Sequence, residues 1–281
     1  MEEIAQNIAE LYETIRRKRP LVHCITNMVT VNDCANILLA AGASPTMASH
    51  PFEAAEITAG CQSLVCNFGA IKDYDAMLCA GKKAAELKHP VIIDPVGIGG
   101  SSYRRECLYE FLKEVPPSCI RGNASEIQAL ICNQKTVTGV DTARNSLFES
   151  DREQFIKLVM EYAAKLQTVL IVSGKMDLIT DGVDCYEVDN GHPMMTKITG
   201  AGCMSTALLG AFFGANRKTE NPALCAAACC AVMGICGEIA ANKCEEVFGG
   251  TMTFRMYLID VVSLLQRDMI LELAKVSKQH L

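Results

Sequence analysis

The chain has 281 residues, of which half are hydrophobic and 21% are charged, and its formal net charge is -6 at pH 7. A chain of this length and apolar content can bury a large core, so we expect one domain over residues 1–281 without long disordered segments. The negative net charge provides no basic surface for nucleic acid, and nucleic-acid partners are therefore not expected.

The fifteen cysteines do not follow a disulfide or zinc pattern. Their number is odd, no C-x-x-C pair occurs, and the five histidines are scattered. Many of the cysteines lie in apolar runs, where cysteine behaves as a small core residue. The N-terminal residues Met1-Glu2-Glu3 are acidic, unlike a signal peptide. We therefore expect free thiols in a reducing cytoplasm.

Apolar periodicity predicts helices and strands that alternate along the chain. The first helix covers 2–18 and ends before Pro20, and its basic cluster Arg16–Arg19 suits the negative end of a helix dipole. Further helices are predicted at 31–41, 74–88, 102–114, 125–132 and 151–166, and strands at 21–25, 63–67, 90–94, 119–121 and 168–173. A polar segment at 134–150, a hairpin of 178–180 with 185–188 around Asp181-Gly182, and a mostly helical stretch from 201 to about 275 complete the chain.

This alternation, with continuous apolar strands, predicts an α/β layered fold with a largely parallel sheet. Two stretches, 201–215 and 222–237, are apolar enough to require comparison with a membrane span. Both are shorter than the roughly 20 residues that a bilayer-spanning helix needs. We expect them to be buried helices, with no membrane partner.

Polar residues follow five of the predicted strands at the points where these strands end. Ligands bind outside the carboxyl ends of the strands in sheets of this kind, so we expect these residues to gather at one edge. The groups are Thr26-Asn27, Asn67-Phe68-Gly69, Asp94-Pro95-Val96-Gly97, Gly122-Asn123-Ala124-Ser125-Glu126 and Ser173-Gly174.

The turn Thr199-Gly200-Ala201-Gly202-Cys203 opens a long apolar helix. Its glycines allow the backbone to approach an anion, and the helix dipole has its positive end there, so the turn is either a phosphate site with a thiol or a packed strand-to-helix turn. The sequence Gly97-Ile98-Gly99-Gly100 lacks the third glycine of a dinucleotide fingerprint, and no Walker A lysine follows it.

Three charged residues near this edge have two interpretations each. Asp94 is either a Mg²⁺ ligand or a cap, and Glu126 is either a metal ligand or the partner of Asn123 in a capping box. Arg121 follows an apolar strand and needs an anionic partner, either a nucleotide phosphate or a local carboxylate.

The sequence resembles the hydroxyethylthiazole kinase family of the ribokinase-like superfamily across residues 20 to 215. The matching stretches occur in the family's order and are specific. They are His23-Cys24-Ile25-Thr26-Asn27, Val31-Asn32-Asp33-Cys34-Ala35-Asn36, Gly42-Ala43-Ser44-Pro45-Thr46-Met47-Ala48, Ile93-Asp94-Pro95-Val96-Gly97, Arg121-Gly122-Asn123-Ala124-Ser125-Glu126 and Thr199-Gly200-Ala201-Gly202-Cys203. The resemblance implies a three-layer α/β/α fold with a central, mostly parallel sheet.

The resemblance also implies an activity and an assembly. The activity is ATP-dependent phosphorylation of the hydroxyl of 4-methyl-5-(2-hydroxyethyl)thiazole with Mg²⁺, in thiamine biosynthesis by salvage. The assembly is a homotrimer with its sites at the subunit interfaces. The implied site residues are Met47, Gly200 and Asn27 at the thiazole, Arg121, Ser173 and Asn123 at ATP, Asp94 and Glu126 at the metal and phosphates, and Cys203 facing the hydroxyl.

A helix N-terminus lowers the pKa of a thiol, so we expect Cys203 to be able to accept the alcohol proton late in the transfer. Whether it acts as a base or shapes the pocket stays open at this point. Another small-alcohol or hydroxymethylpyrimidine kinase of this superfamily, or a non-catalytic ligand-binding protein on this scaffold, are the alternatives. A thiol hydrolase would need a histidine paired with Cys203, which the sequence does not indicate.

Overall fold

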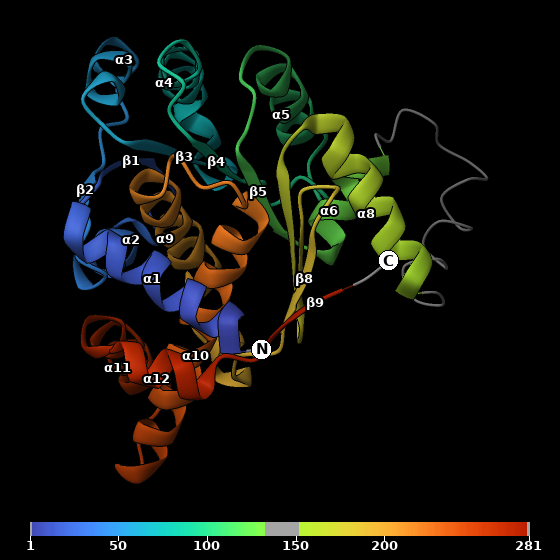
Figure 1. The fold of residues 1–281 in the computed structure, drawn as a ribbon. Coiled ribbons are helices and arrows are strands. Elements are labelled where there is room, and N and C mark those ends of the chain that lie inside the picture. The colour runs from blue at the N-terminus through green and yellow to red at the C-terminus, as the bar shows by residue number, and fades with distance from the viewer. Residues whose placement is uncertain (1, 133–151, 280–281) are drawn as a thin grey trace.

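A nine-stranded sheet forms the centre of the protein in the computed structural model, which describes residues 2–132 and 152–279. The strand order is β2-β1-β3-β4-β5-β6-β7-β8-β9 (Figure 1). The first six strands in this order are parallel, and β7, β8 and β9 join antiparallel. The bounds are β1 Leu21–Ile25, β2 Ser44–Thr46, β3 Ser63–Asn67, β4 Val91–Asp94, β5 Cys119–Asn123, β6 Val169–Ser173, β7 Asp177–Thr180, β8 Cys185–Val188 and β9 Val276–Lys278.

Helices cover both faces of the sheet, which gives the expected three-layer α/β/α architecture (Figure 1). One face carries α1 (Glu2–Lys18), α2 (Val31–Ala40), α9 (Ala201–Ala215), α10 (Pro222–Glu246), α11 (Thr251–Leu264) and α12 (Arg267–Leu273). The other carries α3 (Pro51–Ala59), α4 (Tyr74–Glu86), α5 (Ser102–Glu114), α6 (Ala124–Cys132) and α8 (Arg152–Leu166). Two 3₁₀ segments, η1 (Phe68–Asp73) and η2 (Pro193–Lys197), lie in the connections.

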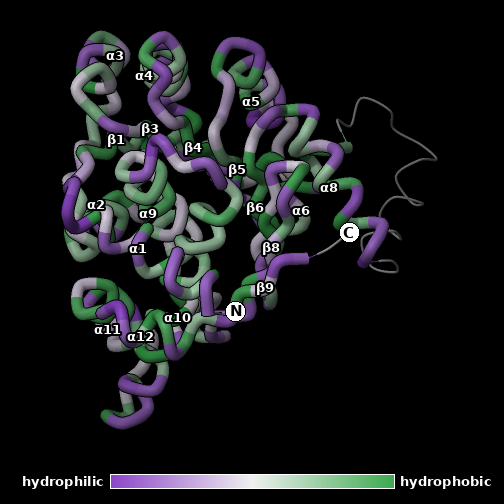
Figure 2. The backbone as a smooth tube through the Cα atoms, in the orientation of Figure 1, coloured by the Kyte–Doolittle hydropathy of each residue, from purple (hydrophilic) through white to green (hydrophobic). Residues whose placement is uncertain are grey.

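The core is divided by the sheet because successive strand residues point to opposite faces. In β6, Ile171 belongs to the buried cluster that contains α10, whereas Leu170 and Val172 belong to the cluster of the other face. Figure 2 shows the corresponding concentration of hydrophobic residues in the central strands. The prediction from the continuous apolar strands, that both faces of the sheet are buried under helices, is therefore confirmed.

The predicted elements agree with the structure within two residues at most ends, and the hairpin around Asp181-Gly182 is confirmed. The sequence analysis missed β2, α3 and β9. The two missed strands have three residues each and contain no apolar alternation, and α3 is signalled only by the N-cap His50 and by Pro51 at its first turn. The segment 134–150 lies outside the described residues.

Helix α10 is longer than the apolar stretch that predicted it. It runs for 25 residues and is, by length and composition, able to cross a membrane. However, 83% of its most apolar window is buried inside the protein, as in the core helix of a soluble protein. The interpretation as a buried helix is therefore confirmed.

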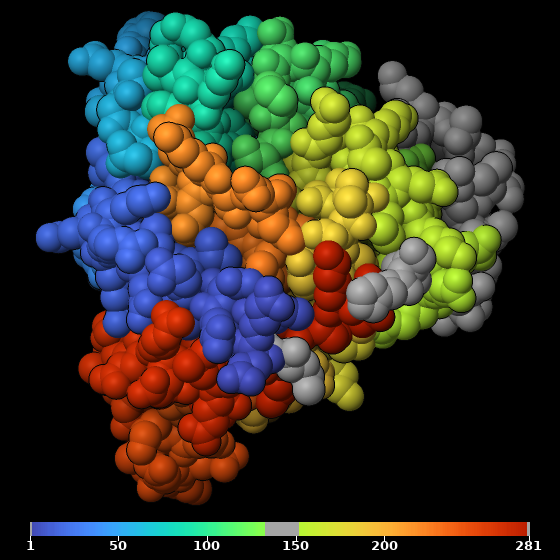
Figure 3. All heavy atoms as spheres, viewed as in Figure 1, coloured from blue at the N-terminus to red at the C-terminus, as the bar shows by residue number. Residues whose placement is uncertain are grey.

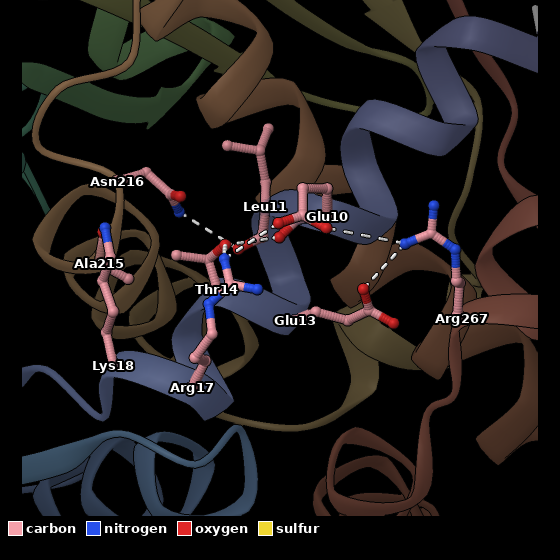
Figure 4. A network of polar contacts seen from close by, with 9 residues as sticks. All are labelled: Glu10, Leu11, Glu13, Thr14, Arg17, Lys18, Ala215, Asn216 and Arg267. Atoms are coloured by element: carbon pink, nitrogen blue, oxygen red, sulfur yellow. Dashed lines mark hydrogen bonds and ion pairs between the residues drawn. The ribbon is translucent and has the colours of Figure 1, made fainter.

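The basic cluster at the end of α1 makes contacts within the fold. Lys18 donates to the carbonyl of Ala215 at the end of α9 (2.6 Å), and Arg17 binds Glu10 (3.0 Å; Figure 4). Arg267 of α12 binds Glu13 (2.8 Å), which ties the C-terminal helices to α1. Figure 3 shows the blue N-terminal helix lying against these red helices. The basic residues at the end of α1 therefore bind the C-terminal end of α9 and a glutamate of their own helix.

Helix α9 lies directly on the central strands through Gly210. A Cβ at this position would lie 2.6 Å from Cγ2 of Val65 and 2.7 Å from Cγ1 of Val22. Both valines are buried in β3 and β1. The absence of a side chain at Gly210 therefore sets the distance between α9 and the sheet.

We predict that Gly210→Ala destabilises the protein. Overpacking costs about 1–3 kcal/mol, and the gain in helix propensity of about 1 kcal/mol offsets only part of it, so we expect a net loss of roughly 1–2 kcal/mol. Urea unfolding measures this loss. The control is Gly60→Ala, whose Cβ would meet no atom closer than 3.6 Å. Equal stability of the two variants would contradict the close packing of α9.

Candidate active site

A cavity of about 840 Å³ opens at the carboxyl ends of β4, β5 and β6. The parallel order of these strands places their polar ends at one edge, as the sequence predicted. Seven of the nine predicted site residues line this cavity: Asp94, Arg121, Asn123, Glu126, Ser173, Gly200 and Cys203. Of the other two, Asn27 contacts Cys203, whereas Met47 packs half-buried against the core and does not line the cavity.

The turn at Gly200 begins α9 beside the cavity. Gly200 has φ +91°, a left-handed conformation that favours glycine, and its carbonyl accepts the first helical bond from the Met204 N–H (2.8 Å). A Cβ at Gly200 would lie 2.7 Å from Cγ2 of Thr30. The glycine is therefore required both by its conformation and by the neighbouring threonine. The free N–H groups of the first turn of α9 are suited to an anion.

Asn67 connects the sheet to the start of α9. Its Nδ2 donates to Oδ2 of Asp94 (2.9 Å) and to Sγ of Cys203 (3.2 Å). Its Oδ1 accepts from the N–H of Gly69 (2.9 Å), which fixes the orientation of the amide. Sγ of Cys203 accepts a second hydrogen bond, from Nδ2 of Asn27 (3.3 Å). Sequence reasoning noted Asn67 as a strand end but did not assign it to the site.

Asp94 is a buried carboxylate at the end of β4, only 3% exposed. Thr206 of α9 donates to the same Oδ2 (3.0 Å) that Asn67 contacts. Burial raises the pKa of Asp94 to about 6, although the nearby Arg121 acts in the opposite direction. The group is therefore ionised at neutral pH but close to its titration range.

The expected low pKa of Cys203 is wrong. Burial raises the pKa of the Cys203 thiol, and the adjacent negative charge of Asp94 raises it further. The hydrogen bonds from Asn27 and Asn67 act in the opposite direction without reversing the shift. Cys203 is therefore a neutral thiol at neutral pH, because burial and the adjacent carboxylate both disfavour the thiolate.

Glu126 forms the capping box that its spacing suggested. Its Oε2 accepts from the N–H of Asn123 (2.9 Å), and its own N–H donates to Oδ1 of Asn123 (3.0 Å). Its Oε1 accepts from the N–H of Gly97 (3.1 Å), which holds the loop after β4. Both carboxylate oxygens of Glu126 are thus used to shape the rim of the cavity.

Arg121 carries an incompletely paired charge beside the cavity. Its Nη1 makes one long hydrogen bond to the carbonyl of Gly202 (3.5 Å), and its Nε is buried without a partner within the described residues. Burial disfavours the charged form, yet the carboxylates of Asp177 and Asp94 raise the pKa of Arg121. None of the ion pairs within 4.0 Å in residues 2–132 and 152–279 includes Arg121. Because Arg121 lines the cavity, its guanidinium is suited to a phosphate oxygen there.

Asp177, Lys175 and His192 also line the cavity and were not predicted. Asp177 accepts from the N–H of Gly174 (2.9 Å) and thereby fixes the turn after Ser173. These residues belong to a hairpin and a loop whose positions relative to the parallel strands follow from tertiary packing. The sequence therefore contained no periodic signal for their role.

The mostly parallel sheet with helices on both faces defines the class of α/β proteins with ribokinase-like architecture. A ribokinase-like superfamily protein from Enterococcus faecalis has the same fold, with a TM-score of 0.56 and 11% identity over 95% of each chain. The chain matches the hydroxyethylthiazole kinase family over residues 12–268 and belongs to that family.

Individual relatives agree with this assignment. The hydroxyethylthiazole kinase of Clostridium acetobutylicum is 43% identical over 264 residues, which covers 93% of this chain and 96% of the relative. Hydroxyethylthiazole kinase 1 of Methanosphaera stadtmanae is 42% identical, and the match covers 97% of this chain and 98% of the relative. The solved structure of a hydroxyethylthiazole kinase protein from Pyrococcus horikoshii matches with a TM-score of 0.85 and 33% identity. The match covers 98% of this chain and 99% of that chain. The chain is therefore a kinase.

The raised pKa of Asp94 predicts an acid limb in the kinase activity. Below about pH 6, Asp94 gains a proton and the cavity loses a negative charge, so kcat/KM should fall up to tenfold per pH unit and stay level above that pH. Initial rates from about pH 5 to about pH 8 measure the profile. Cys203→Ala should lower kcat but keep this acid limb, since the thiol is already neutral. A profile without an acid limb, or one whose limb disappears with Cys203, would contradict the assignment.

Proposed function

We propose that this kinase transfers the γ-phosphoryl group of ATP to the primary hydroxyl of 4-methyl-5-(2-hydroxyethyl)thiazole, a step of thiamine salvage in the cytoplasm. The observation that carries the proposal is the convergence of the incompletely paired Arg121 guanidinium and the first turn of α9 on one cavity. Family membership supports the acceptor, because the relatives are named for it. The fifteen free cysteines are consistent with a reducing compartment.

Arg121 and the N–H groups of α9 provide the electrostatic part of the reaction. The transition state of phosphoryl transfer spreads charge over the transferred oxygens, so fixed donors stabilise it without reorganisation. Arg121, Ser173 and Asn123 hold the nucleotide phosphates from the ends of β5 and β6. The helix start lies at the acceptor end of the cavity, beside Cys203.

Asp94 is suited to a Mg²⁺ ion bound together with ATP. Its hydrogen bonds all reach Oδ2, so within the described residues its Oδ1 has no protein partner. No cluster of three or more His, Cys, Asp or Glu that could hold a metal occurs in that part of the chain. The support for Mg²⁺ is the open Oδ1 of Asp94, because Mg²⁺ uses few carboxylates and keeps water and phosphate oxygens. The ion would neutralise phosphate charge, and Glu126, whose oxygens bind backbone N–H groups, would act on it through water.

Cys203 faces the alcohol as a neutral thiol. A loose transition state requires little deprotonation of the attacking hydroxyl, so a strong base is not needed before the transfer. The two amides on Sγ, from Asn27 and Asn67, hold the thiol in place. We propose that Cys203 shapes the acceptor pocket. Its thiol already carries a proton, so the proton of the attacking hydroxyl passes to an oxygen of the transferred phosphoryl group and not to Sγ.

The thiazole lies between Met47, Gly200 and Asn27 at an interface of a homotrimer in this proposal. The two residues that follow Asn27, Met28 and Val29, are 73% and 70% exposed. Large apolar side chains at such exposure beside a site are typical of an interface. In this proposal Met47, which does not line the cavity of its own chain, contacts the thiazole that is bound at a neighbouring subunit. Sedimentation equilibrium measures the assembly directly.

We predict that the purified protein with Mg-ATP converts the thiazole alcohol to its phosphate ester. Mass spectrometry of the reaction mixture measures the gain of one phosphoryl group on the thiazole and the loss of one from ATP. Hydroxymethylpyrimidine is the matched acceptor control. Turnover of the pyrimidine without turnover of the thiazole would make the protein a different small-alcohol kinase, and binding of ATP without turnover of either would make it a non-catalytic protein.

We predict that Arg121→Met raises KM for ATP at least tenfold, roughly the effect of losing one charge-assisted hydrogen bond. This change also removes the positive charge that faces the carboxylates of Asp177 and Asp94, so Tm without ATP should be lower than in the native protein. Steady-state kinetics and thermal unfolding measure the two effects. The control is Arg217→Met, an exposed arginine that donates to the Lys88 carbonyl. A lower Tm with unchanged KM would make Arg121 a structural residue.

A further inference from the structure

His23 is a buried histidine that the reaction described above does not use. It lies in β1, is 0% exposed and faces α3. Its Nε2 is 2.7 Å from the carbonyl oxygen of Ala48, and its Nδ1 is 2.7 Å from Oγ1 of Thr58 in α3. The imidazole thus connects the sheet, the segment after β2 and helix α3.

The partners of His23 determine its tautomer. A carbonyl oxygen only accepts, so Nε2 carries the hydrogen and donates to Ala48, and Nδ1 of the neutral ring accepts from the hydroxyl of Thr58. Burial lowers the pKa of His23, and the bond to Ala48 and the charge of Glu53 only partly oppose this effect. The ring is therefore neutral at neutral pH, and the direction of both hydrogen bonds is fixed.

Ala48 follows Met47, which the proposed function places at the thiazole. The preceding strand β2 has three residues and lies at the edge of the sheet, with β1 as its neighbour. Thr46 is its last residue and pairs with His23. Beyond Thr46 the chain leaves the sheet. Among the described residues, the side chain that makes a hydrogen bond to the segment 47–49 is that of His23, through the Ala48 carbonyl.

We propose that His23 is a positioning residue for the acceptor alcohol: its Nε2–H holds the Ala48 carbonyl and thereby fixes Met47 against the thiazole. The inference rests on the proposed function for the identity of the acceptor. A short edge strand does not by itself fix the residue that follows it, whereas a buried hydrogen bond of known direction does. His23 acts through the backbone of residues 47 and 48 and touches neither ATP nor the reacting atoms.

The experiment compares His23→Leu with His23→Gln. Leucine removes both hydrogen bonds and keeps an apolar group in the space, so KM for the thiazole alcohol should rise about tenfold, with kcat and KM for ATP within about twofold of the native values. The amide nitrogen of glutamine reaches about as far as Nε2 of histidine and donates to Ala48. His23→Gln should therefore return KM for the alcohol to within about threefold of the native value.

Leu64→Val is the matched control, because Leu64 lies beside His23 in the sheet and is equally buried. It should lower Tm without changing KM for the alcohol. An unchanged KM in His23→Leu, an equal rise of KM for ATP, or a defect in His23→Gln as large as that in His23→Leu would overturn the proposal.

A substrate-free measurement separates this proposal from the proposed function. Hydrogen exchange of the peptide that covers residues 44–52 should be faster in His23→Leu than in the native protein and in Leu64→Val, because the segment loses its anchor. If the native protein does not phosphorylate the thiazole, the function fails while this exchange result still tests the anchor. Exchange that is unchanged in His23→Leu would overturn the anchor whatever the substrate is.

Discussion

The buried carboxylate of Asp94 is the group around which the candidate active site is arranged. A charge at 3% exposure requires hydrogen-bond partners, and Asp94 finds them in Asn67 at the end of β3 and Thr206 in α9. The bond from Thr206 to Asp94 holds the first turns of α9 against the carboxyl end of β4. Further along the same helix, Gly210 allows α9 to approach β1 and β3 closely. The position of Cys203 follows, because Asn67 binds the carboxylate and the thiol with the same amide nitrogen.

The cavity combines charged groups of both signs. Arg121 and the first turn of α9 favour an anion, whereas Asp94 and Asp177 are carboxylates in the same space. A polyphosphate that carries a divalent cation would pair with both kinds of group at once: the phosphates with Arg121 and the first turn of α9, and the cation with the carboxylates. The proposed metal–nucleotide complex therefore matches the local charges of the cavity, even though the chain as a whole has a net charge of -6.

Much of the fold could be predicted from the sequence because the parallel strands are buried on both faces and their apolar runs are continuous. The polar residues at the ends of β4, β5 and β6 were found for the same reason, since parallel strands end at a common edge. Three elements escaped prediction. The strands β2 and β9 have three residues each and are held by pairing with β1 and β8, so their existence depends on a neighbour and not on their own pattern. Helix α3 has only an N-cap and a proline as a local signal.

The sequence by itself determined the layered α/β fold and the edge at which the site lies, because periodicity and strand ends are local properties of the chain. Strand ends, the glycine turn and the family resemblance together predicted seven residues that line the cavity. It also contained the capping box of Glu126, which is a local contact. Tertiary structure alone decided that Asn67 joins Asp94 to Cys203, that Arg121 lacks a full set of partners, and that His23 holds the segment of Met47. It also reversed the expected shift in the pKa of Cys203. Burial and the charge of a distant residue set that pKa, and neither can be read from the residues on either side of the cysteine.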